Sequence, residues 1–93
     1  MIRIIAKKTL RLYWERHANC EQHLKTWHET VRTSDWHSPN DIKRVYASAS
    51  ILPNNRVVFN IKGNSYRLIV KFNPDYTIEL LLLIQTTANQ PFL

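Results

Sequence analysis

The sequence predicts an α+β fold, in which two to three helices of the first half pack on one face of a mainly antiparallel sheet of about four to five strands. Apolar residues recur at helical spacing up to about residue 46, and further on they alternate as they do in strands. With 93 residues, 44% of them apolar and one a glycine, the chain can bury one core. We therefore expect residues 1–93 to form a single domain.

The first third of the chain contains a strand candidate at residues 2–5, followed by two amphipathic helices. In residues 7–17 a stripe with i, i+3, i+4, i+7 spacing consists of Leu10, Tyr13, Trp14 and His17. Asn19 is expected to cap the second helix, and Gln22 would complete a capping box. The apolar stripe of that helix consists of Leu24, Trp27 and Val31.

A short third helix is expected after Ser38. Ser38 is a typical cap, Pro39 suits the first helical turn, and Asp41 places an acid at the third position. The apolar residues expected on this helix are Ile42, Val45 and Tyr46.

From Ser48 onward the pattern changes to that of strands and turns. Gly63-Asn64 is typical of a two-residue hairpin turn, because both residues tolerate the positive φ that such turns require. Residues 77–84 are apolar on both faces, which is typical of a covered or central strand. The expected strands are 51–52, 56–62, 65–72 and 77–84, with turns at 53–55, 63–64 and 74–75.

The hairpin turn decides which side chains share a face of the sheet. It places Asn60 opposite Arg67 and Arg56 opposite Lys71. Opposed cations destabilise a sheet unless an anion lies between them, so we interpret their face as a phosphate-binding surface rather than a solvated one. A slip of one residue would exchange the two faces. The apolar face consists of Val57, Phe59, Ile61, Tyr66, Leu68 and Val70, and the polar face of Arg56, Asn60, Lys62, Ser65, Arg67 and Lys71 around Val58 and Ile69.

The net charge of the chain is +6, from 13 basic and 7 acidic residues, and no acid occurs between Asp41 and Asp75. This excess predicts a polyanionic partner, either nucleic acid or an acidic protein. Cys20 is the one cysteine, so an intramolecular disulfide is excluded and a reducing cytoplasm is expected. The start of the chain does not have the pattern of a signal peptide, and Leu80 to Ile84 is too short to span a membrane.

Other candidate sites carry less weight. His17, Cys20 and His23 have a spacing seen among metal ligands, but a fourth ligand is missing, so no metal and no cofactor are expected. His28 and His37 are interpreted as polar surface residues. The chain has no glycine-rich phosphate loop. Core packing rather than base stacking is the expected role of Trp14, Trp27 and Trp36.

Three segments resemble the HigB toxins of the RelE-like type II toxin-antitoxin superfamily. They are Arg3 to Leu10, Asp35 to Lys43 and, above all, Asn54-Asn55-Arg56-Val57-Val58-Phe59-Asn60-Ile61-Lys62-Gly63-Asn64-Ser65-Tyr66-Arg67-Leu68. The likeness covers residues 2 to 78. It implies a RelE-like fold, ribosome-dependent mRNA endonuclease activity, and a helix-turn-helix antitoxin, HigA, as partner. For HigA we expect a surface of the helical layer, with a tryptophan partly exposed, or the rim of the sheet.

The resemblance also implies a mechanism in which a 2′-hydroxyl of the mRNA attacks the adjacent phosphodiester. Such a reaction needs a base and needs cations that stabilise the developing charge. We assign Arg67 and Lys62 as the catalytic residues. The residues expected to bind RNA are Arg56, Asn60, Asn64 and Lys71.

The C-terminal end departs from the family pattern. Members usually have a Gly-Thr-His-x-x-Tyr-Asp type motif, whereas here Thr87 takes the place of the histidine, Gln90 that of the tyrosine, and Leu82 that of a common arginine. Neither Thr87 nor Gln90 titrates near neutral pH. Either the gene product is frameshifted or degenerate, or this chain uses other groups. The function expected is thus a toxin with impaired nuclease activity, and the alternative is a non-catalytic module that binds an acidic protein.

Overall fold

The computed structural model describes residues 2–5, 7–63 and 65–85, and its elements follow the expected order. The helical elements are α1 (Lys7–Arg16), the short 3-10 helix η1 (Ala18–Cys20), α2 (Glu21–Arg32) and α3 (Pro39–Val45). The strands are β1 (Arg3–Ile5), β2 (Ser50–Leu52), β3 (Arg56–Ile61), β4 (Tyr66–Phe72) and β5 (Thr77–Gln85). The predicted α+β class is confirmed.

The five described strands form one sheet in the order β1-β5-β4-β3-β2. Strands β2 to β5 are antiparallel neighbours, as a chain of short connections dictates. Strand β1 is the exception, because it pairs in parallel with the first three residues of β5 and places Ile4 beside Ile78. The sheet is therefore mixed but mainly antiparallel.

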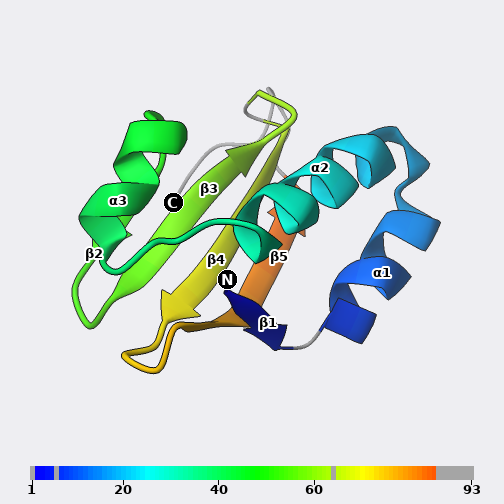
Figure 1. The fold of residues 1–93 in the computed structure, drawn as a ribbon. Coiled ribbons are helices and arrows are strands. Elements are labelled where there is room, and N and C mark those ends of the chain that lie inside the picture. The colour runs from blue at the N-terminus through cyan, green and yellow to red at the C-terminus, as the bar shows by residue number, and fades with distance from the viewer. Residues whose placement is uncertain (1, 6, 64, 86–93) are drawn as a thin grey trace.

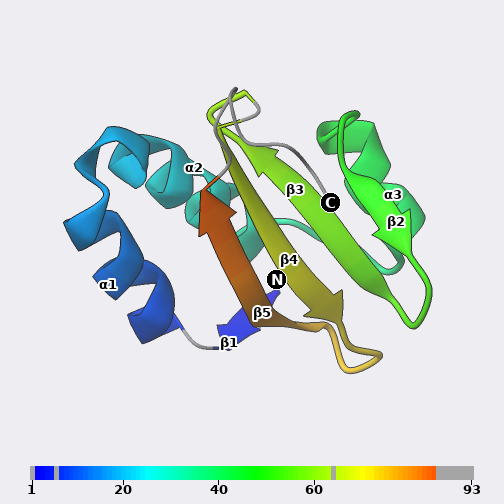
Figure 2. The same cartoon turned by 180° about the vertical axis from the view of Figure 1, so that it is seen from behind.

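The helices lie on one side of this sheet, as the two opposite views in Figures 1 and 2 show. Trp27 of α2 is 2% exposed, and its ring meets the ring of Phe59 edge to face, with centroids 5.4 Å apart. Burial of each such large apolar side chain stabilises the fold by about 1.5 to 3 kcal/mol. Seen from behind in Figure 2, β4 and β5 lie in front of α2. The core thus occupies one face of the sheet and leaves the other face free of the described helices.

The start of α2 differs from the prediction. Asn19 does not cap it, because residues 18 to 20 form η1 and Cys20 takes the cap position. The Asn19 side chain serves a tertiary contact instead: its Oδ1 accepts a hydrogen bond of 2.6 Å from the hydroxyl of Tyr66. Ser38 does occupy the cap position of α3, but its side chain makes no capping hydrogen bond.

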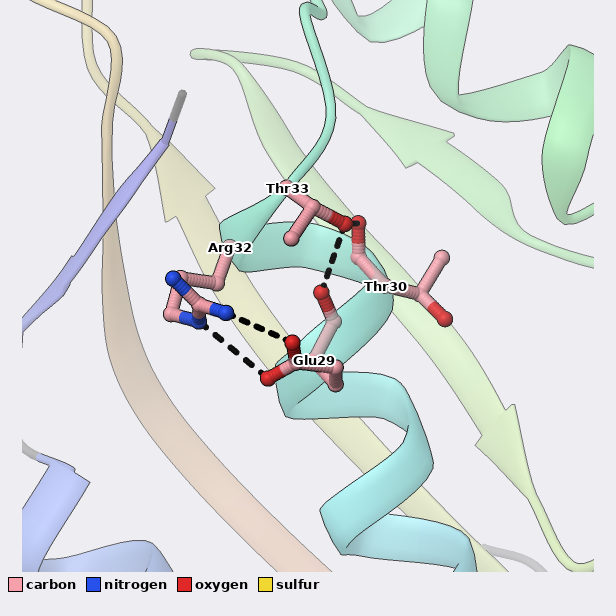
Figure 3. Close-up of polar contacts among 4 residues, drawn as sticks. All are labelled: Glu29, Thr30, Arg32 and Thr33. Atoms are coloured by element: carbon pink, nitrogen blue, oxygen red, sulfur yellow. Dashed lines mark hydrogen bonds and ion pairs between the residues drawn. The ribbon is translucent and has the colours of Figure 1, made fainter.

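Local hydrogen bonds close the end of α2, as Figure 3 shows. The guanidinium of Arg32 binds both carboxylate oxygens of Glu29, at 2.6 and 3.2 Å. The hydroxyl of Thr33 donates to the carbonyl of Glu29 at 2.9 Å and thereby satisfies one of the carbonyls that a helix end leaves open. None of the helices in the described part of the chain is long and apolar enough to cross a membrane.

Candidate nucleic-acid interface

The β3-β4 hairpin has the predicted register. Asn60 lies opposite Arg67, and Arg56 lies opposite Lys71. The backbone N–H of Ser65 donates to the carbonyl of Lys62 at 3.1 Å and closes the turn. The positive φ of Gly63, +63°, explains why a glycine stands there.

This register sorts the side chains into the two faces expected. The face toward the helices is buried and consists of Val57, Phe59, Ile61, Tyr66, Leu68 and Val70. On the opposite face, Arg56 and Lys71 are exposed, whereas Asn60 and Arg67 are half-buried. We call this second surface the open face; it consists of Arg56, Val58 and Asn60 of β3, Arg67, Ile69 and Lys71 of β4, and the residues of β5 paired with them.

The paired strands end at Ile61 and Tyr66, so Lys62 and Ser65, which were predicted as strand ends, lie in the turn and face each other across it. Lys62 is exposed and has a φ of +53°. This left-handed conformation costs a residue with a side chain about 1 to 2 kcal/mol. The tight turn accounts for this conformation, because the adjacent Gly63 has a similar positive φ.

Strand β5 adds a third row to the open face that the hairpin alone did not predict. Ile84 lies opposite Arg67, Leu82 opposite Ile69, and Glu79 opposite Lys71. Glu79 puts an acid on a face that the sequence indicated as purely basic. Leu82 is 49% exposed and therefore lies on this surface. Strand β5 is central, as predicted, but no described helix covers this face of it.

A hollow of about 310 Å³ lies between α2 and the edge of β3, on the helical side of the sheet, and Asn60 is the one residue of its described lining that belongs to the open face. The hollow lies beside residues 60 to 62. Strand β2 does not cover this part of the β3 edge, because it pairs only with residues 56 to 58. No sequence pattern indicates that the residues around the hollow lie together, because their proximity depends on how α2 crosses the sheet. The hollow is lined by Gln22, His23, Thr26, Trp27, Tyr46, Asn60, Ile61 and Lys62.

The hydrogen bonds around this hollow hold the β3 edge in place. The side-chain amide of Asn60 donates to the carbonyl of Ser48 at 3.3 Å. Burial raises the pKa of Tyr46, although a hydrogen bond with Thr30 opposes the shift. Tyr46 therefore stays neutral at physiological pH and forms one wall of the hollow.

The three tryptophans are buried. Trp14, Trp27 and Trp36 are 7%, 2% and 5% exposed, so they pack in the core as predicted. The expectation that one of them is partly exposed to a partner is wrong, because the sheet and the helices enclose all three.

The histidines occupy four different environments. His28 is buried rather than on the surface as expected, and its burial together with the nearby charge of Lys7 holds its pKa below the usual value. His37 is exposed, with its ring edge-on to Tyr76 at 5.3 Å. His17 stacks on Tyr13 at 4.1 Å. His23 is thus the histidine that lines the hollow beside Asn60 and Lys62.

Cys20 is fully buried, and its Sγ donates to the carbonyl of His17 at 3.1 Å. Burial raises the pKa of the thiol, which is the opposite of what a nucleophilic cysteine needs. Among the described residues, His, Cys, Asp and Glu side chains form no group of three that could hold a metal ion.

Three predicted or family-matched positions lie outside the described residues. They are Asn64, Thr87 and Gln90.

A comparison with protein families gives a match to a toxin family. The family described as HigB_toxin, RelE-like toxic component of a toxin-antitoxin system, matches residues 20–88, which is well over half of the chain. No curated protein matches the sequence.

Proposed function

This chain belongs to the HigB family of RelE-like toxins, and from that premise we propose that it binds RNA on the ribosome through its open face and that its mRNA-cleaving activity is impaired. It would act in the cytoplasm, without a metal or cofactor. As the toxic component of a toxin-antitoxin system it has an antitoxin as counterpart, and we propose that this antitoxin is a helix-turn-helix protein of the HigA kind.

The observation that carries the proposal is the register of β3 and β4. Arg56 and Lys71 lie opposite each other, and Arg67 follows on the same exposed face. Arg56 and Lys71 repel each other in the free protein, Glu79 on the other side of Lys71 offsets part of this repulsion, and an anion that lies between the two cations stabilises both. A phosphate backbone supplies such charges at regular spacing, and each neutralised phosphate releases counterions.

Cleavage makes a further demand that the sequence does not meet. Arg67 and Lys62 supply positive charge for a phosphate in the transition state. A base must also remove the proton of the 2′-hydroxyl, and general acid-base assistance is worth about 10² to 10⁴ in rate. Threonine and glutamine at positions 87 and 90 do not provide it. We therefore propose that binding is retained while cleavage is slow.

The experiment that tests the proposal is co-sedimentation with ribosomes over a salt series. We expect association at low salt and a steep loss as salt rises, because phosphate contacts dominate the affinity. Absence of association at low salt would contradict RNA binding.

A second function, the binding of an acidic protein segment, is favoured by one observation. Val58, Ile69 and Leu82 form an apolar row across the open face between the cations. An amphipathic acidic segment would match this pattern. Binding to an acidic peptide but not to ribosomes would favour this alternative.

A further inference from the structure

We propose that the hollow between α2 and the edge of β3 receives one unstacked nucleobase of a single-stranded RNA bound on the open face. This inference rests on the proposed function, since it names a subsite for the same ligand.

The lining of the hollow has the chemistry that a nucleobase requires. Trp27 and Tyr46 contribute aromatic surface. Gln22 and Asn60 contribute amide groups, which can pair with the donors and acceptors at the edge of a base. A volume of about 310 Å³ lies at the lower end of the range typical of small-molecule sites. The hollow therefore suits one base better than an extended protein segment.

The indole N–H of Trp27 gives an independent indication of a ligand. Trp27 is 2% exposed, and its Nε1 is buried with no hydrogen-bond partner in the part of the chain that the structure describes. Buried donors without a partner are uncommon in native proteins. A carbonyl oxygen or ring nitrogen of a base is the kind of acceptor that this N–H lacks.

Lys62 and Asn60 connect the hollow to the open face. Asn60 lines the hollow and lies opposite Arg67 in the sheet. Lys62 lines the hollow and is exposed, so its ammonium group can contact the phosphate next to an inserted base. None of the described residues that line the hollow is acidic. An RNA strand on the cations of β3 and β4 reaches the hollow by turning around the β3 edge at Asn60 and Lys62.

The test compares two fluorescently labelled ligands of equal charge, a short single-stranded oligoribonucleotide and the same oligomer with abasic sites. Fluorescence anisotropy at low salt gives both affinities. We expect the protein to prefer the base-bearing oligomer by about tenfold, since contact of a base with aromatic groups adds to the phosphate contacts. Equal affinities would overturn the pocket while leaving the proposed function intact. Failure to bind either oligomer would overturn both.

The variant that fills the hollow is Thr26→Leu, on the exposed side of α2. This variant should lower the affinity for the base-bearing oligomer until the ratio of the two affinities is about one. The affinity for the abasic oligomer should not change. The matched control is Thr9→Leu, an exposed threonine of α1 outside this hollow, which should keep the preference. An undiminished preference in Thr26→Leu contradicts the inference. Thermal unfolding of both variants confirms that they fold.

A second readout applies to the unmodified protein. In ¹⁵N NMR spectra, the indole signal of Trp27 should shift on addition of the base-bearing oligomer, whereas those of Trp14 and Trp36 should not. A shift caused by an acidic peptide but not by the oligomer would overturn the inference.

Discussion

Arg67 of β4 lies directly opposite Asn60 of β3 and has Ile84 of β5 on its other side. This places the arginine near the middle of the open face, between the hollow at the β3 edge and the apolar side chains of β5. Arg67 is half-buried, so the stem of its side chain is covered by neighbours. A guanidinium held in this way is well suited to bind a phosphate in a defined position.

Replacement of Arg67 by alanine should weaken RNA binding and reduce the salt slope of the affinity by about one phosphate contact. We expect the free energy of unfolding to fall by about 1 kcal/mol, because the variant loses the packing of the half-buried stem of Arg67. Anisotropy and urea unfolding measure the two effects. The control is Lys25→Ala on α2, where an exposed lysine pairs with Glu21. Loss of folding in Arg67→Ala would show that the arginine is structural.

Replacement of Lys62 by glycine separates binding from stability. Glycine adopts a φ of +53° without strain, so the variant should be as stable as the parent chain or up to about 1 kcal/mol more stable. RNA affinity should nevertheless fall, because the ammonium group is removed. The control is Lys8→Ala, which removes an exposed lysine of α1. Alanine is used there because glycine would destabilise the helix. Unchanged affinity for RNA in Lys62→Gly would exclude this lysine from the site.

The local part of this site followed from the sequence, and the non-local part did not. Gly63 and the alternation around it determine the β3-β4 register, so the positions of Arg56, Arg67 and Lys71 were predictable. The position of Glu79 depends on a register shift between β4 and β5 at Ile69 and Val70, which no short pattern marks.

In the helices, too, local features were predictable from the sequence and non-local ones were not. The apolar stripe of α2 was predicted correctly, because helical periodicity is a local property. The role of Asn19 was not, since its partner Tyr66 is 47 residues away in the chain. The hollow likewise requires α2 and β3 to meet, so its residues belong together only in the folded protein.

His28 makes stability depend on pH. Its pKa is lower in the folded protein than the ordinary 6.5, owing to burial and then to Lys7. The unfolded chain therefore binds more protons between these two pKa values. The free energy of unfolding is therefore not reduced by His28 above about pH 6.5. It falls as the pH is lowered from there through the pKa of His28 in the folded protein. Denaturant unfolding at pH 7.5 and pH 5 should show the loss, and His28→Gln should reduce it. A variant of the exposed His37 to glutamine should retain the dependence, and the explanation fails if His28→Gln retains it equally.

Restoration of the family motif should raise the cleavage rate. We expect the double variant Thr87→His with Gln90→Tyr to cleave mRNA on translating ribosomes faster than the parent chain, by part of the factor of about 10² to 10⁴ that acid-base assistance provides. The control, Thr87→Ala with Gln90→Ala, should leave the rate low. Cleavage by the parent chain as fast as that of a relative with the intact motif would place the base among other residues.

The open face as the RNA-binding surface is tested most directly by NMR mapping with a single-stranded oligoribonucleotide at low salt. The account predicts that the largest changes in signal position fall on Arg56, Asn60, Lys62, Arg67 and Lys71, and that they diminish as salt is added. Changes confined to α1 and the outer side of α2, or no changes at low salt, would contradict it.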